Sequence, residues 1–221
     1  MRVGMFDAVV FDLDGTILDT LPDLVELTNA VMRAGGYPTH TTTEVLTFVG
    51  GGIDVLLQRA LPQGTNPEAI AACRKLWVEL YPQYGYELTK PYDGMEAALA
   101  QMKDAGLRLG VLSNKFDTAA REVVETYYPE AFDLVRGESP STPRKPDPTG
   151  LLKMVDDLGT TPVRTAYVGD SGATDMAVAQ AAGAYAIGVT WGYQSVDTLV
   201  EHGARLLVDS PAQLAEFVLN A

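Results

Sequence analysis

The chain reads Ala-Val-Val-Phe-Asp-Leu-Asp-Gly-Thr over residues 8–16, a short apolar run that ends in two closely spaced acids. A continuous apolar run of this length is typical of a strand buried on both faces of a parallel sheet. Side chains alternate along an extended chain, so Asp12 and Asp14 face the same space beyond the strand, and Gly15 permits a sharp turn there. Two neighbouring carboxylates repel each other, and a hard divalent cation relieves that repulsion. The stretch predicts a Mg²⁺ site; the alternative is a polar turn, in which Asp and Gly are common.

The rest of the chain alternates between strand-like and helix-like segments. Further apolar runs cover residues 107–112, 165–168, 184–189 and 206–208. Helical patterns lie between or after them, at residues 94–105, 119–127, 148–158, 174–182 and 211–219. This order predicts an α/β fold with a Rossmann-like parallel sheet core and helices on both faces. Right-handed crossovers then place all strand carboxyl ends, and the ligand site, along one edge of the sheet.

One region breaks the alternation. Residues 21–87 contain helical patterns and no convincing strand, with helices expected from Leu21 to the Gly35-Gly36 pair, over 55–61 and over 67–81. We therefore predict a catalytic core formed by residues 1–17 and 89–221 and an inserted all-helical cap domain formed by residues 18–88. The alternative is a helical extension packed away from the catalytic edge. The proline-rich stretch 137–147 is expected to form a loop.

Composition narrows the classes of function. The 221 residues include 16 Lys and Arg against 29 Asp and Glu, for a net charge of −13, which disfavours a nucleic-acid surface. A small anionic substrate remains possible, because it needs only a local positive site. Cys73 is the single cysteine, which excludes an intrachain disulfide. We expect no contact with membranes and a cytoplasmic protein, since neither a signal-peptide pattern nor an apolar run of about 18 residues is present.

Three further segments carry polar groups, two of them at the ends of predicted strands and one, around Lys145, before a predicted helix. They are Ser113-Asn114-Lys115, Lys145-Pro146-Asp147 and the stretch 168–175, which contains Asp170 and Asp175. Each is weak alone, because Ser-Asn pairs often cap helices and most lysines are solvated. Together they predict that one sheet edge gathers hydroxyl, ammonium and carboxylate groups suited to a phosphate and a metal.

These segments, in this order, resemble the signature motifs of the haloacid-dehalogenase-like (HAD) hydrolase superfamily. The resemblance covers nearly the whole chain. Residues 11–20, Pro91-Tyr92-Asp93-Gly94 and Val189-Thr190-Trp191-Gly192-Tyr193 look most like the phosphoglycolate phosphatase branch, and the helical insertion matches the position of that branch's cap.

The resemblance implies a role for each motif residue. Asp12 is expected to be the nucleophile that forms an aspartyl-phosphate, and Asp14 the general acid and then base. The phosphoryl oxygens are expected to be bound by Ser113, the backbone amide of Asn114, and Lys145. The expected Mg²⁺ ligands are Asp12, the backbone carbonyl of Asp14, and Asp170.

Two residues have less definite roles. Asp175 follows Asp170 by five positions, whereas many relatives space these acids by four, so it is expected to orient a metal-bound water or Lys145. Gly51, in the triplet 50–52, resembles part of the cap's substrate-specificity loop; the alternative is a turn between helices.

The leading hypothesis is a Mg²⁺-dependent phosphatase of a small phosphorylated metabolite, with 2-phosphoglycolate as the best guess. One alternative is a phosphosugar mutase of the β-phosphoglucomutase type, although Thr16 stands where such relatives usually carry a bulky aliphatic residue. Another is a phosphatase for a different substrate, such as a pyrophosphatase or a sugar phosphatase. A catalytically dead binding protein is disfavoured because all the motif residues are present. The oligomeric state, monomer or homodimer, stays open.

Overall fold

A computed structural model describes residues 4–221, and within them the chain divides into two compact units. One unit, the core unit, comprises residues 4–18 and Pro91–Ala221; the other, the inserted unit, comprises Asp19–Lys90. The chain passes between them through β2 (Leu18–Asp19) and β3 (Lys90–Pro91), which pair as a two-stranded sheet.

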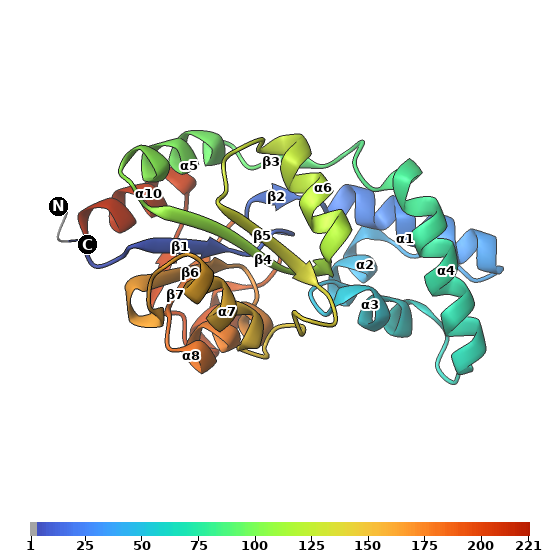
Figure 1. Ribbon diagram of the computed structural model, residues 1–221. Coiled ribbons are helices and arrows are strands. Elements are labelled where there is room, and N and C mark those ends of the chain that lie inside the picture. The colour runs from blue at the N-terminus through green and yellow to red at the C-terminus, as the bar shows by residue number, and fades with distance from the viewer. Residues whose placement is uncertain (1–3) are drawn as a thin grey trace. The chain divides into compact units, whose positions relative to one another are not determined.

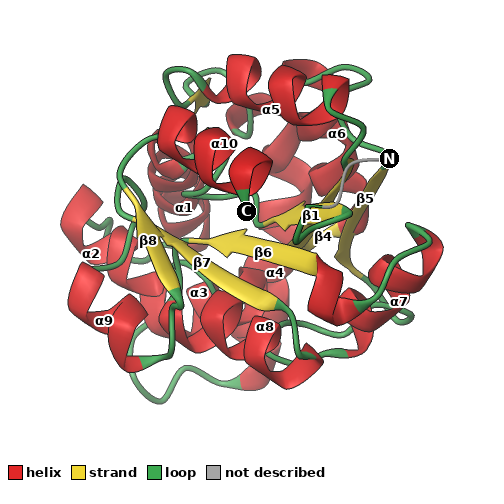
Figure 2. Ribbon diagram, turned by 90° about the vertical axis from the view of Figure 1, so that its left-hand side faces the viewer, coloured by secondary structure: helices red, strands yellow, loops and turns green. Residues whose placement is uncertain are grey.

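The core unit is built on a six-stranded parallel sheet in the order β5-β4-β1-β6-β7-β8; most of its strands are labelled in Figure 1, and β8 is labelled in Figure 2. Its strands are β1 (Ala8–Phe11), β4 (Arg108–Phe116), β5 (Leu134–Glu138), β6 (Thr165–Gly169), β7 (Tyr185–Val189) and β8 (Leu206–Val208). From β1 the chain adds β4 and β5 on one side and then β6, β7 and β8 on the other, so the order reverses at β1. In parallel sheets, ligands bind beyond the strand carboxyl ends at such a reversal.

Helices cover both faces of this sheet, as Figure 2 shows. One face carries α5 (Met95–Asp104), α6 (Asp117–Tyr127) and α10 (Pro211–Asn220), and the other carries α7 (Thr149–Asp157), α8 (Ala177–Ala182) and α9 (Val196–Glu201). The central strand β1 is buried along its whole length, and so is β6. Burial on both faces explains why these strands read as unbroken apolar runs. The predicted fold class is confirmed.

Several elements differ from the sequence expectation. Strand β5 was not expected, and its last two residues fall in the stretch predicted to be a loop; it is an edge strand and mostly half-buried, so it lacks an apolar signature. The helix expected over 174–182 begins instead as a π-helical turn, η2 (Gly172–Met176). There the backbone N–H groups of Asp175 and Met176 both donate to the carbonyl of Ser171, which widens the turn. A short 3₁₀ turn, η1 (Pro162–Arg164), precedes β6.

The inserted unit consists of helices: α1 (Leu21–Gly35), α2 (Thr42–Phe48), α3 (Gly52–Ala60) and α4 (Pro67–Tyr84). Sequence patterns missed α2, a short helix held at its start by a capping box between Thr41 and Glu44. Helix α1 packs mainly on α4, with Leu27, Val31 and Trp77 buried. No helix within residues 4–221 combines the length and apolar character that crossing a bilayer requires.

Asp23 ties the two ends of the inserted unit together. Its buried carboxylate accepts from the backbone N–H groups of Leu88 and Thr89 and from the Thr89 hydroxyl, at 2.6 to 3.1 Å. Asp23→Ala leaves these donors without their charged partner, so we expect the free energy of unfolding to fall by about 3 kcal/mol. Urea unfolding followed by circular dichroism measures this loss.

Asp54→Ala is the matched control, because Asp54 forms an exposed ion pair with Arg74 in the same unit. Such a pair contributes about 1 kcal/mol or less. Equal losses in the two variants would contradict the proposed importance of Asp23.

Candidate active site

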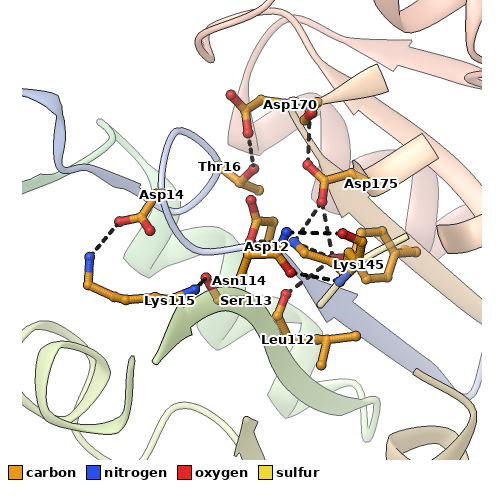
Figure 3. Close-up of polar contacts among 12 residues, drawn as sticks. Asp12, Asp14, Thr16, Leu112, Ser113, Asn114, Lys115, Lys145, Asp170 and Asp175 are labelled. Carbon is orange, nitrogen blue, oxygen red and sulfur yellow. Dashed lines mark hydrogen bonds and ion pairs between the residues drawn. The ribbon is translucent and has the colours of Figure 1, made fainter. Parts of the chain in front are cut away.

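The predicted site residues of the core unit come from four segments that meet at the carboxyl edge of the sheet (Figure 3). Asp12 directly follows β1, and its backbone N–H donates to Val168 of β6 at 2.9 Å, which fixes it beside the neighbouring strand. Ser113 and Asn114 lie in β4, and Asp170 follows β6. Lys145 lies in the loop between β5 and α7, and Asp175 lies in η2. The remaining motif acid, Asp14, lies two residues beyond Asp12.

Lys145 is the buried cation at the centre of the site. Its ammonium lies 2.6 Å from Oδ1 of Asp12 and 2.7 Å from Oδ1 of Asp175, and it donates to the Tyr167 hydroxyl at 3.0 Å. The Asn114 side chain holds the lysine backbone in place: its Oδ1 accepts from the Lys145 N–H at 2.7 Å and its amide donates to the Lys145 carbonyl at 3.2 Å. The cation is therefore held at both its backbone and its ammonium.

Burial and neighbouring charges shift the pKa values of Lys145 and Asp12. Burial alone would lower the pKa of Lys145, but the negative charges of Asp12 and Asp175 outweigh it and hold the pKa well above its usual value. Burial, followed by the charge of Asp175, raises the pKa of Asp12 to about 7, with Lys145 acting in the opposite direction. The Lys145 ammonium therefore stays charged. Its single positive charge does not fully offset the effect that burial and the negative charge of Asp175 have on Asp12.

Asp175 is fully engaged by groups of the protein. Besides its contact with Lys145, its Oδ1 accepts from the Tyr167 hydroxyl at 3.3 Å, and its Oδ2 accepts from the Ser171 backbone N–H at 2.9 Å. Its side chain is buried completely. These contacts suit a residue that orients Lys145.

Asp170 is held differently. Oδ1 accepts from the Thr16 hydroxyl at 3.1 Å, and Oδ2 accepts from the Tyr193 backbone N–H at 2.8 Å. Gly15 makes room for this carboxylate, since a Cβ at this position, where φ is +84°, would meet Asp170 Oδ2 at 2.5 Å. Burial and the charges of Asp175 and Asp12 raise the pKa of Asp170 well above its usual value.

The donor set fits a divalent metal ion. One carboxylate oxygen each from Asp12, Asp170 and Asp175 lie within 4.8 Å of one another. Three buried carboxylates face one buried ammonium, Lys145, which leaves two negative charges, and a divalent cation balances that charge with the oxygen ligands it prefers. Asp12 and Asp175 share the Lys145 ammonium, whereas the contacts of Asp170 are with the neutral Thr16 hydroxyl and Tyr193 backbone N–H, so Asp170 gains most from a bound cation.

Asp14 lies in a separate ion pair. Its Oδ1 is 3.0 Å from the ammonium of Lys115, and both side chains are mostly buried. Figure 3 shows this pair on the other side of Asp12 from Lys145. Ser113 lies beside it, and its hydroxyl accepts from the Lys115 backbone N–H at 3.2 Å.

Gly51 belongs to the inserted unit, where it precedes α3. A Cβ on Gly51 would lie 2.8 Å from the side chain of Val55, so close packing within this unit accounts for the glycine. Its expected role in substrate binding stays a prediction.

Sequence reasoning missed three groups that shape this site: the Tyr167 hydroxyl, the Thr16 hydroxyl as a partner of Asp170, and the Lys115 ammonium. Tyr167 stands in the interior of a buried strand, where a hydroxyl needs a hydrogen-bond partner, and this was an available signal. The hydroxyl oxygen accepts from Lys145, and its single proton is shared between Asp175 Oδ1 at 3.3 Å and the Leu112 carbonyl at 3.2 Å, which links β6 to β4. The contacts of Thr16 and Lys115 carried no signal, since both partners are distant in sequence.

Comparison with known proteins agrees with this architecture. Residues 9–189 match a family model described as haloacid dehalogenase-like hydrolase. A phosphoglycolate phosphatase of Vibrio cholerae is 33% identical, covering 96% of each chain. An N-acetylmuramic acid 6-phosphate phosphatase of Pseudomonas aeruginosa is 32% identical, covering 100% of this chain and 98% of that protein. A crystal structure assigned to a phosphoglycolate phosphatase of Lactobacillus delbrueckii superposes with a TM-score of 0.92 at 28% identity, covering 98% of this chain and all of that one.

Proposed function

The chain belongs to the haloacid dehalogenase-like hydrolase family and is a phosphatase of a phosphorylated small molecule, and we propose that it hydrolyses 2-phosphoglycolate to glycolate and phosphate. The observation that carries the mechanism is the buried Asp12 carboxylate, which lies 2.6 Å from the Lys145 ammonium at the carboxyl edge of the sheet. The relatives that share about a third of their residues over nearly the whole chain support the substrate. We further propose a cytoplasmic location, in keeping with a single cysteine.

In the proposed reaction, Asp12 attacks phosphorus and forms an aspartyl-phosphate, while the acid form of Asp14 gives its proton to the ester oxygen as the bond from that oxygen to phosphorus breaks. Asp14 then accepts a proton from the water that hydrolyses this intermediate, so one hard displacement becomes two easier ones. Lys145, Ser113 and the backbone N–H of Asn114 bind the phosphoryl oxygens. The Lys145 charge lets an anionic nucleophile approach an anionic phosphate.

We propose Mg²⁺ as the metal, held by Asp12, Asp170 and the backbone carbonyl of Asp14. When bound, Mg²⁺ supplies positive charge that lowers the repulsion between the nucleophile and the phosphate. In this scheme Asp175 and Tyr167 keep Lys145 in place, and Thr16 keeps Asp170 in place.

Removal of divalent metal is expected to abolish activity. Phosphate release from 2-phosphoglycolate should fall to the background rate in EDTA, because Asp12 is then left among uncompensated carboxylates, and added Mg²⁺ should restore it. Thermal unfolding should change in parallel: a bound cation relieves the repulsion between Asp12 and Asp170, so Mg²⁺ raises the Tm. Full activity in EDTA would refute the metal requirement.

A panel of phosphate esters tests the substrate. N-acetylmuramic acid 6-phosphate is the second candidate, since one relative with that activity matches the entire chain. Each ester is assayed for released phosphate under the same Mg²⁺ concentration. A clear preference for 2-phosphoglycolate in kcat/KM is the expected result, and a preference for the sugar phosphate would replace it.

A further inference from the structure

Lys115 is a mostly buried cation that has no role in the proposed mechanism. Its side chain is 8% exposed and lies near the carboxyl end of β4. Its ammonium contacts Oδ1 of Asp14 at 3.0 Å. Withdrawing an ammonium from water is costly, so a lysine held here next to the proposed acid points to a role in the site.

A shift in the strand register of β4 sets the position of this lysine. Along the pairing of the two strands, β4 advances four residues, from Leu112 to Phe116, while β5 advances two. Such bulges redirect side chains and are frequent next to active sites. Gly137 of β5 permits the bulge, because a Cβ there would lie 2.4 Å from the carbonyl oxygen of Lys115. The backbone of two strands is thus shaped around the position of Lys115.

The contact with Asp14 places Lys115 next to the leaving group of a bound substrate; this step rests on the proposed function. If Asp14 protonates the leaving alcohol, the ester oxygen lies within hydrogen-bond reach of the Asp14 carboxylate. Lys115 contacts that same carboxylate, so the atoms bonded to the ester oxygen come close to its ammonium. Figure 3 shows the other cation, Lys145, on the opposite side of Asp12, next to the nucleophile. The two lysines therefore face the two ends of a bound substrate.

We infer that Lys115 selects substrates whose leaving alcohol carries a carboxylate on the carbon bonded to the ester oxygen, as in 2-phosphoglycolate. A lysine ammonium has three N–H donors on a flexible stem, so it can contact Asp14 and a substrate carboxylate together. A site that binds a charged group discriminates strongly against an analogue that lacks it. Lys115 is in this sense a specificity-determining residue, and Lys145 remains the phosphoryl-binding one.

The test compares two substrates that differ in one group: 2-phosphoglycolate and 2-hydroxyethyl phosphate, in which a hydroxymethyl group replaces the carboxylate. The measured quantity is the ratio of their kcat/KM values, in the wild type and in Lys115→Met. We expect the substitution to lower this ratio by about 100-fold, because only the carboxylate substrate loses its partner. Lys153→Met, the same change at an exposed lysine of α7, should leave the ratio unchanged.

The ratio separates recognition from other roles of Lys115. If the lysine only orients Asp14, both substrates lose activity equally and the ratio stays within about threefold, which overturns the inference. If the wild type itself shows no preference for the carboxylate substrate, the proposed substrate fails as well. Circular dichroism checks that Lys115→Met folds. Should it not fold, Lys115→Gln takes its place, together with inhibition of the wild type by glycolate but not by ethylene glycol; no inhibition by glycolate overturns the inference.

Discussion

Asp12→Asn is expected to reduce turnover by on the order of 10⁵-fold, the scale of losses when a covalent nucleophile is removed. The reason is that the amide has nearly the shape of the carboxylate but cannot attack phosphorus. It also removes one of the charges that suit the site to a divalent metal. The rate of phosphate release at saturating substrate and Mg²⁺ measures the loss. Substantial residual turnover in a folded variant would exclude Asp12 as the nucleophile.

The stability of the same variant provides the control. In the metal-free protein, burial and Asp175 raise the pKa of Asp12 from 3.8 to about 7. The ionised form is therefore disfavoured in the folded state, and wild-type stability is lost as the pH rises through this interval. Asparagine stays neutral, so at about pH 8 in EDTA the variant should unfold at a Tm no lower than that of the wild type. A much lower Tm would attribute the lost activity to misfolding.

Lys145→Ala is expected to lower kcat/KM by about 10²- to 10³-fold, the usual result of removing one charged or hydrogen-bonding group that stabilises a transition state. Its ammonium contacts the Asp12 carboxylate at 2.6 Å and is placed to neutralise charge on the transferring phosphoryl group. Steady-state kinetics over a range of 2-phosphoglycolate concentrations measures the loss. An unchanged kcat/KM would refute the phosphate-binding role.

Loss of folding must be separated from loss of catalysis, since Lys145→Ala also leaves the buried Asp12 and Asp175 without their cation. Breaking a buried ion pair costs about 3–5 kcal/mol, so the fraction of folded protein is determined by urea unfolding under assay conditions. Tyr167→Phe is the matched control: it removes a hydrogen bond to the same ammonium but no charge. We expect that variant to retain activity within about tenfold of the wild type.

The sequence alone determined the fold class and predicted the edge of the sheet at which the candidate site residues gather. Strands β1 and β6 are buried on both faces, so they appear as apolar runs, and the acids that follow them stand out. The family assignment rested on the same local patterns, since each motif occupies a few consecutive residues. Strand β5 gave no such signal, because an edge strand is only partly covered.

The contacts between motifs were decided by the tertiary structure. Asp175 and Lys145 are 30 residues apart in the sequence, and Lys115 and Asp14 are 101 residues apart. No local sequence pattern therefore encodes either contact. The bulge in β4 depends on close approach to Gly137 of another strand. Local composition fixes which segments become strands, because burial acts on each segment by itself. The pairing of each ammonium with a particular carboxylate depends on the crossover connections and on the strand register. Both arise only when the whole sheet is assembled.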